Sequence, residues 1–290
     1  MTSDCRIEED PSLMIAAGSA TPVEIDGGRY DAVVFDMDGV ITDTATVHAA
    51  AWKRMFDAYL VEREARTGEH QPPFDEHDYR MFVDGKHRDD GVASFLESRR
   101  IVLPLGSPGD PPGSSSVWAL ANGKNADFLQ VLAAGGARAF PSSVSFVRDL
   151  QRHGIGTAII SASRNCQQVL EAAGIGDLFS VRVDGIETER LSLPGKPSPA
   201  VFIEAASRLG ASPARAVVVE DAVAGVQAGR AGDFALVVGV DRVGQVADLL
   251  ANGADVVVRD LGQLHAAGLS YRGIGPSALV TRRDGRHHGE

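Results

Sequence analysis

The sequence predicts an α/β protein, a doubly wound parallel sheet that carries an inserted α-helical cap domain. Three observations lead to this fold class. Short β-branched runs recur along the chain, helix-like stretches separate them, and over a hundred residues lie between the first run and the second. A single crossover helix needs far fewer residues, so we expect that interval to form a domain of its own.

The first predicted strand is the run at residues 32–35, which is β-branched and aromatic and stops at polar residues, as a buried strand does. Similar runs predict further strands at residues 157–160, 216–219, 235–240 and 255–258. Helix-like stretches are found at residues 144–153, 165–173, 200–209 and 222–231. Strands that alternate with helices form a parallel sheet, whose functional residues lie at the carboxyl ends of the strands.

The cap domain is expected at residues 46–138, because amphipathic stretches with a helical period occupy this part of the chain. They are residues 47–61, 75–82, 92–99 and 125–133. Between the last two, residues 104–116 contain eleven Gly, Pro or Ser residues in thirteen. Such a segment cannot hold a regular helix or a central strand, so it predicts a surface loop. The core domain is then expected at residues 30–45 and 139–270.

The two ends of the chain are expected to lie outside these domains. Residues 1–29 are rich in Gly, Ser and Asp and lack a sustained period, which predicts a flexible leader. Residues 271–290 are expected to be a C-terminal extension. The leader is acidic where a secretory signal is basic, and no run of about 18 apolar residues predicts a membrane span.

The composition restricts the partners. The chain has 39 acidic and 28 basic residues and a net charge of −11, whereas binding nucleic acid or an anionic membrane through bulk charge needs a basic face. Two cysteines cannot form a disulfide framework. No motif identifies a macromolecular partner, so we expect a cytoplasmic monomer that acts on a small molecule.

Carboxylates follow two of the predicted strands. Asp36 and Asp38 end the first strand, and Gly39 permits a sharp exit, although an isolated pattern of this kind could equally be a turn. Glu220 and Asp221 end another strand in the same way. If the two ends meet, each pair of like charges at about 4 Å would repel by about 4 kcal/mol at an effective dielectric of about 20. A bound cation is therefore expected, and oxygen-only ligands favour Mg²⁺.

Two further features would suit a phosphate. The strand at residues 157–160 ends in a Ser-Ala-Ser-Arg-Asn segment that begins at Ser161, which places hydroxyl groups and a helix N-terminus at the same edge. Ser and Asn are also ordinary helix caps, so this segment could simply be a cap. Lys196 could be a solvated lysine, but the chain has only four lysines, and this one lies where an ammonium group could neutralise phosphoryl oxygens.

In this order, the segments resemble the four motifs of the haloacid dehalogenase (HAD) superfamily of phosphoryl-transfer enzymes. The motifs are DMDGVITDT, the strand that ends at Ser161, Lys196-Pro197, and Val219-Glu220-Asp221. The likeness covers about residues 31–260. The segments SASRN, GKPSPAVFIEAA and VEDAVAGVQA further resemble the β-phosphoglucomutase subfamily, whose cap lies between the first and second motifs.

The resemblance implies a role for each motif residue. Asp36 would be the nucleophile that becomes an aspartyl phosphate, and Asp38 would be the general acid/base. Ser161 and Lys196 would hold the transferring phosphoryl group. The implied Mg²⁺ ligands are Asp36, the main-chain carbonyl of Asp38, and Asp221, with Glu220 nearby or acting through water.

The resemblance also implies that the cap selects the substrate. Residues 84–90, which include Gly85, match the specificity loop of the subfamily, and the counterpart of Arg88 binds the phosphate that is not transferred. The other implied substrate-binding residues are His48, Trp52, Lys124, Asn125, Ser163, Arg164 and Asn165. His48 could instead belong to a core stripe, and Arg88 could be a solvated charge at a helix start. Lys86 and His87 differ from the subfamily loop and could alter sugar selection.

The implied reaction interconverts β-D-glucose 1-phosphate and glucose 6-phosphate through an aspartyl phosphate and a glucose 1,6-bisphosphate. One alternative is a Mg²⁺-dependent sugar-phosphate phosphatase, in which water attacks the aspartyl phosphate and the same aspartates serve. A remote alternative is a non-catalytic sugar-phosphate sensor, which should have lost one of the chemical groups. The sequence retains all of them, which favours an enzyme.

Overall fold

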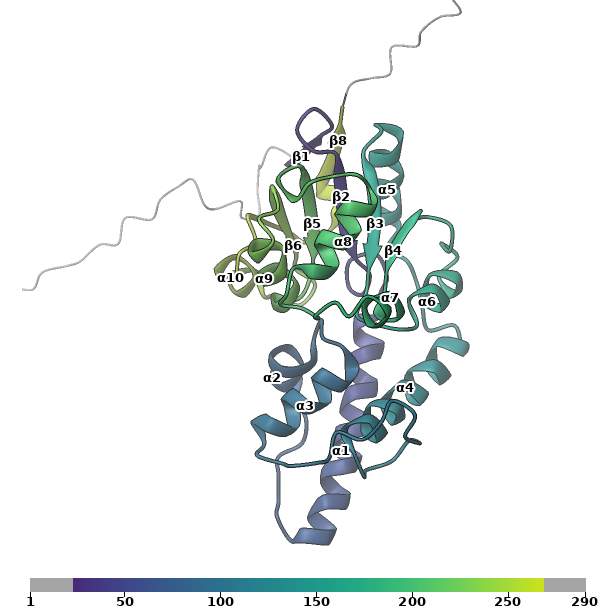
Figure 1. Cartoon of the computed structure of the whole chain (residues 1–290), viewed down its shortest axis with the longest axis vertical. Helices are drawn as coiled ribbons and strands as arrows, with labels where there is room; N and C mark the ends of the chain where they lie inside the picture. The colour runs from purple at the N-terminus through teal and green to yellow at the C-terminus, as the bar shows by residue number, and fades with distance from the viewer. Residues whose placement is uncertain (1–22, 269–290) are drawn as a thin grey trace, which may run out of the picture.

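The computed structural model describes residues 23–268, in which a parallel sheet flanked by helices lies above a group of helices (Figure 1). The sheet has six strands in the order β4-β3-β2-β5-β6-β7, and every neighbouring pair is parallel. Its strands are β2 (Ala32–Asp36), β3 (Gly156–Ile160), β4 (Val181–Val183), β5 (Ala216–Glu220), β6 (Leu236–Val240) and β7 (Val256–Val258). The predicted doubly wound parallel sheet is confirmed.

Helices cover both faces of this sheet because successive side chains of each strand point to opposite sides. Val33 and Phe35 of β2 pack in one apolar cluster with α5 (Pro141–Arg152) and α6 (Cys166–Ala172). Val34 packs in the other, with three helices. These are α8 (Ala200–Arg208), α9 (Val223–Ala231) and α10 (Val246–Ala251). The apolar run of β2 is thus buried on both faces, as in other parallel sheets.

The strand register decides which side chains meet beyond the sheet. Asp36 of β2 lies opposite Ile160 of β3, and Phe35 lies opposite Val219 of β5. The residues that follow these positions therefore leave the sheet at the same edge, the one formed by the carboxyl ends of the strands. This is the edge that faces the group of helices below the sheet in Figure 1.

That group lies in the chain between β2 and α5. Its elements are α1 (Ala45–Thr67), α2 (Glu76–Asp78), the π-helical turn η2 (Tyr79–Val83), α3 (Arg88–Ser98) and α4 (Val117–Ala133). We call it the cap. It has its own apolar cluster, in which Phe56 packs on Phe95 with ring centroids 4.1 Å apart. As predicted, residues 104–116 contain no helix or strand.

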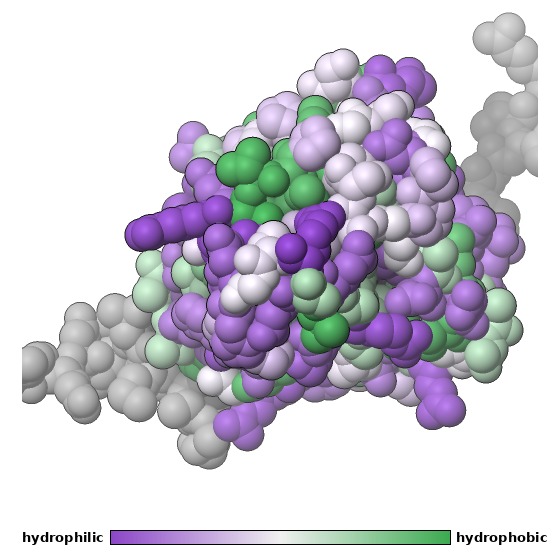
Figure 2. Space-filling model, turned by 90° about the horizontal axis from the view of Figure 1, so that it is seen from below, coloured by the Kyte–Doolittle hydropathy of each residue, from purple (hydrophilic) through white to green (hydrophobic). Residues whose placement is uncertain are grey.

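The exposed surface of the cap is mostly hydrophilic. Seen from the cap end in Figure 2, apolar side chains form small, separate patches. Val61, Val102 and Leu105 are the most exposed large apolar residues of the cap. Among the described helices, none has both the length and the apolar character that crossing a membrane requires.

One prediction about the chain ends is wrong. The leader was expected to extend to residue 29, but β1 (Val23–Asp26) pairs in parallel with β8 (Leu264–Ala267), and Ile25 is fully buried. A strand of four residues has too little local pattern to stand out, and its partner lies at the far end of the described chain. The predictions for residues 1–22 and 271–290 fall outside the described residues.

Five short elements were also missed, because each is too short for a period to be visible. They are β4, α7 (Gly185–Arg190), α10 and the one-turn helices η3 (Pro213–Arg215) and η4 (Leu261–Gln263). Of these, α7 matters most, because it follows β4 at the edge of the sheet that faces the cap.

Candidate active site

The turn after β2 brings two acidic segments together. Asp36 ends the strand, and Gly39 has a left-handed φ of 78°, which glycine adopts without strain. A Cβ atom at this position would lie 1.7 Å from Oδ2 of Asp221. Glycine is therefore required for two reasons, the backbone conformation and the close approach of the Asp221 carboxylate.

Lys196 lies between the carboxylates at this edge. Its Nζ donates to Oδ1 of Asp36 at 2.6 Å and to Oε1 of Glu220 at 2.5 Å, and its side chain is only 3% exposed. Burial alone would lower the pKa of Lys196, but the charges of Asp36 and Glu220 raise it above its ordinary value. Lys196 therefore stays charged and partly balances the acidic cluster.

The same cluster could hold a metal ion. Asp36, Glu220 and Asp221 each offer an oxygen, and these oxygens lie within 4.8 Å of one another. Burial, followed by the charge of Glu220, raises the pKa of Asp36 to about 7 and the pKa of Asp221 well above its ordinary value. The three residues thus fit a hard cation, which would remove this repulsion. The side chain of Asp38 is not in this group.

Asp38 instead faces the cap. Thr44 donates a short hydrogen bond from Oγ1 to Oδ1 of Asp38. Nε2 of His48, on α1, lies 3.5 Å from the same oxygen, and Nδ1 of His48 lies 2.6 Å from Nζ of Lys124 on α4. Burial and the charge of Lys124 hold the pKa of His48 well below its ordinary value. Neutral His48 can therefore accept the Lys124 hydrogen bond and present Nε2–H toward Asp38.

Aromatic rings fix this arrangement. The ring of His48 stacks on Phe128 with centroids 4.1 Å apart, and Nζ of Lys124 lies 5.0 Å from the ring of Trp52 and 5.1 Å from that of Phe128. Burial lowers the pKa of Lys124 to about 7, although the charge of Asp38 opposes this shift. His48 and Trp52 thus do contribute to packing, and His48 also reaches the Asp38 carboxylate.

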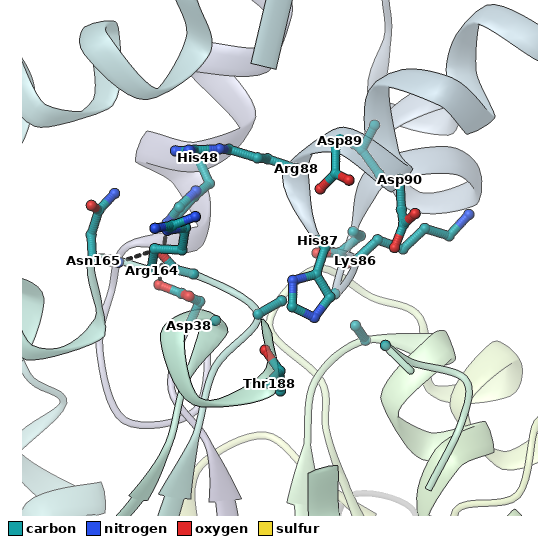
Figure 3. A pocket seen from close by; sticks show the side chains of 18 of the residues that line it. Asp38, His48, Lys86, His87, Arg88, Asp89, Asp90, Arg164, Asn165 and Thr188 are labelled. Atoms are coloured by element: carbon teal, nitrogen blue, oxygen red, sulfur yellow. Dashed lines mark hydrogen bonds and ion pairs between the residues drawn. The ribbon is translucent and has the colours of Figure 1, made fainter. Parts of the chain in front are cut away.

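Polar groups from the cap and the core meet on the other side of the site. Figure 3 shows Arg88 reaching from the cap, and Arg164 and Asn165 from the turn after β3, toward the same part of the pocket. Nδ2 of Asn165 donates to Oδ1 of Asn125 at 2.7 Å, and N of Asn165 donates to Oγ of Ser163 at 3.1 Å. Among the described residues, nothing accepts a hydrogen bond from the buried Nε of Arg88.

A cavity of about 480 Å³ lies between the cap and the core. Most of the predicted site residues line it: Asp36, Asp38, His48, Trp52, Gly85, Arg88, Lys124, Asn125, Ser163, Arg164, Asn165, Glu220 and Asp221. Ser161 and Lys196 are not in its lining. Both are buried, and each contacts a lining residue, since Oγ of Ser161 accepts from N of Ser163 at 3.0 Å and Lys196 binds Asp36.

The cap loop lies directly on the core. A Cβ atom on Gly85 would lie 3.3 Å from that of Ala222, and one on Gly195 would lie 2.8 Å from Cδ2 of His87. Both contacts join the cap to the core across the cavity. The cap loop is therefore in contact with the core in this conformation.

Known proteins share this architecture. A sequence model of the haloacid dehalogenase-like hydrolase family matches residues 30–233. The chain belongs to this family. Like its relatives, this HAD protein is an enzyme of phosphoryl transfer or hydrolysis.

Individual proteins are also similar to this chain. A β-phosphoglucomutase of Mycobacterium tuberculosis is 48% identical over 240 residues, which cover 81% of this chain and 92% of that protein. An uncharacterized glycosyl hydrolase of the same organism is 43% identical over 263 residues, covering 91% of this chain but 19% of that protein. A crystal structure of β-phosphoglucomutase from Clostridium difficile has 25% identity and a TM-score of 0.62, covering 81% of this chain and 92% of that one.

Some lining residues of this HAD site were not singled out from the sequence, although Asp84 lies within the predicted specificity loop. Asp84 belongs to the cap loop, and burial followed by the charges of Asp36 and Asp38 raises its pKa to about 6, although Tyr79 opposes this by a hydrogen bond. Thr188 and Glu189 come from α7. Asp184, the N-cap residue of α7, is a helix-start signal that could have revealed this helix.

Proposed function

We propose that this HAD enzyme interconverts β-D-glucose 1-phosphate and glucose 6-phosphate through an aspartyl phosphate and a glucose 1,6-bisphosphate. The observation that supports it best is that one cavity lies between two groups of residues suited to phosphate, which we call its first and second phosphate ends. The first end is lined by Asp36, which Lys196 contacts from outside the lining, and the second is lined by Arg88 and Arg164. A mutase must bind two phosphates of one sugar at once, whereas hydrolysis of a monophosphate needs only the first end.

In this mechanism Asp36 is the nucleophile and carries the phosphoryl group. Phosphorylated Asp36 donates to the C6 hydroxyl of glucose 1-phosphate while Asp38 takes the proton of that hydroxyl. The bisphosphate then turns around, Asp36 receives the phosphoryl group from C1, and Asp38 returns the proton to the C1 oxygen. Mg²⁺ held by Asp36, Glu220 and Asp221 would offset negative charge on the phosphoryl oxygens.

Lys196 supports both transfers. An anionic carboxylate attacks an anionic phosphoryl group only where positive charge offsets their repulsion, and Lys196 is charged and buried beside Asp36. A cap that closes over the substrate would exclude water from the aspartyl phosphate, which favours a sugar hydroxyl over water as the acceptor. The phosphatase alternative differs only in that acceptor.

Product analysis tests the proposal. The protein would be incubated with Mg²⁺, β-D-glucose 1-phosphate and a trace of β-glucose 1,6-bisphosphate, with α-D-glucose 1-phosphate as the matched control. We expect glucose 6-phosphate from the β anomer only, with little inorganic phosphate. Rapid release of inorganic phosphate without formation of glucose 6-phosphate would contradict the mutase proposal and support the phosphatase alternative.

Replacing Arg88 with alanine should separate the two reactions. We expect mutase turnover to fall about 100-fold, because a guanidinium that binds a phosphate is a strong, directional contact that also orients the sugar. Hydrolysis of a small ester such as p-nitrophenyl phosphate should fall much less, because such a substrate has no second phosphate. Arg88→Lys keeps the positive charge, so its mutase turnover should fall less than that of Arg88→Ala. Equal losses of mutase turnover and ester hydrolysis would contradict the assignment of Arg88 to the second phosphate end.

Replacing Thr44 with valine should move the acid limb of the pH profile. Burial, followed by the charge of Asp36, raises the pKa of Asp38 to about 6, and the Thr44 hydrogen bond opposes this shift. A base must be ionised, so kcat/KM should fall as the pH falls through about 6. Without the Thr44 donor the limb should move up by about one pH unit. Thr46→Val, at an exposed neighbour, is the control, and an unshifted limb in Thr44→Val would contradict the assignment of Asp38.

Two expectations from the sequence stay predictions, namely that the enzyme is a monomer and that it works in the cytoplasm. Gel filtration with light scattering tests the first, and cell fractionation tests the second.

A further inference from the structure

Glu189 occupies part of the second phosphate end. It lines the cavity, and its Oε2 lies 2.7 Å from Nη1 of Arg164. The two side chains are 56% and 40% exposed, so both are free to exchange partners with a ligand or with water. Among the described residues, Arg164 is the only cation within ion-pair distance of Glu189. The carboxylate of Glu189 thus pairs with Arg164, which in the proposed function binds a phosphate of the substrate.

Backbone packing holds Glu189 and Arg164 close to each other. N of Gly185, at the start of α7, donates to the carbonyl of Ser163 at 3.1 Å. A Cβ atom on Gly185 would lie 2.8 Å from the carbonyl oxygen of Ala162 and 2.9 Å from N of Arg164. The helix that carries Glu189 is therefore pressed against the turn that carries Arg164, and their separation does not depend on long, mobile loops.

Glu189 has no evident role in the stability of α7. It lies in the last turn, where a negative charge opposes the helix dipole. The neighbouring Arg190 pairs instead with Glu187, which also binds Arg208. The ion pairs of this surface are thus complete without Glu189.

The second phosphate end has unsatisfied cationic groups even with Glu189 present. Burial, followed by the charge of Arg164, lowers the pKa of Arg88, while the charges of Asp89 and Glu189 raise it. Arg88 and Arg164 both line the same part of the cavity (Figure 3), and Nε of Arg88 is buried without a partner among the described residues. A phosphate with several acceptor oxygens can satisfy both arginines, whereas the single carboxylate of Glu189 binds only Arg164.

We propose that Glu189 is an internal counterion of the second phosphate end, bound to Arg164 when no ligand is present and displaced by the phosphate that is not transferred. The identity of that phosphate rests on the proposed function. Free inorganic phosphate must compete with Glu189 unaided. A sugar phosphate already held at Asp36 presents its second phosphate at a high effective concentration and displaces Glu189 easily. Glu189 thus makes the second phosphate end favour the phosphate of a sugar that is already bound at Asp36 over free inorganic phosphate.

Binding of inorganic phosphate tests this selection without any turnover, so the result is independent of whether the enzyme is a mutase. Isothermal titration calorimetry in Mg²⁺ buffer would compare the unmodified protein with Glu189→Gln. We expect phosphate to bind about fivefold more tightly to the variant, which corresponds to about 1 kcal/mol and matches the usual strength of a partly exposed ion pair.

Two further variants make the test specific. In an Arg164→Ala background, Glu189→Gln should leave phosphate affinity unchanged, because the competing pair is already lost. Glu204→Gln removes an equal charge from a pair with Arg208 and should also have no effect. The proposal is overturned if Glu189→Gln does not tighten binding, if Glu204→Gln tightens it equally, or if the effect survives without Arg164.

Discussion

Asp36→Asn should reduce phosphoryl transfer by at least about 10⁴-fold, because an amide cannot attack phosphorus or carry the phosphoryl group. Asparagine keeps the size of the side chain and an oxygen that can accept the hydrogen bond of Lys196. Turnover of the sugar phosphate and retention of labelled phosphate on the protein would be measured together. Unchanged turnover would exclude the covalent mechanism for both the mutase and the phosphatase.

The same variant should be at least as stable as the unmodified protein above pH 7. The pKa of Asp36 is raised to about 7 in the folded protein, so its ionisation disfavours folding as the pH rises from about 4 through 7. Asparagine removes this cost. Thermal melts at pH 8 would check the prediction, with the exposed Asp177→Asn as a control. A much lower Tm in Asp36→Asn would mean that lost activity reflects lost structure.

Lys196→Met should have the largest effect on stability. Its ammonium group is the partner of two buried carboxylates, Asp36 and Glu220, and removing one partner of a buried ion pair costs about 3–5 kcal/mol. Phosphoryl transfer should also fall, by about 10³-fold, because a preorganised cation beside the transferring group is lost. Urea unfolding and steady-state kinetics would measure the two effects.

The pH dependence of the Lys196→Met loss has a definite sign. The charge of Lys196 lowers the pKa of Asp36, so its removal raises that pKa above about 7. A carboxyl group with a raised pKa favours the folded state at low pH, where it is neutral, and disfavours it at high pH. The deficit should therefore be larger at pH 8 than at pH 6. Lys196→Arg keeps the charge and should show a smaller deficit, while equal deficits at both pH values would contradict this electrostatic account.

Local pattern was enough to predict the centre of the site. The apolar runs that became β2 and β5 stop at Asp36 and at Glu220, and parallel strands in register bring such ends together. The sequence left open whether the two strand ends meet, and the pairing of β2 with β5 in the structure brings them together. The strands did not show which cation would balance these carboxylates, and Lys196 was identified by its position, by the rarity of lysine and by its match to a family motif.

Contacts between distant segments could not be predicted. The ion pair of Glu189 with Arg164 depends on α7, a helix of six residues with no visible period. The packing of His87 on Gly195 depends on how the cap closes, which no local pattern specifies. Likewise β1 is stable only because β8 pairs with it. In each case the deciding partner is remote in sequence.

The pairing of β1 with β8 has an architectural consequence. It brings the first and last described strands side by side at the pole of the molecule that lies opposite the cap (Figure 1). A unit whose entry and exit points are adjacent can be spliced into a longer polypeptide without being pulled apart. The uncharacterized glycosyl hydrolase that matches 91% of this chain is a longer polypeptide, since the match covers 19% of its own length. Neighbouring domains attached at this pole would leave the opening and closing of the cap unobstructed.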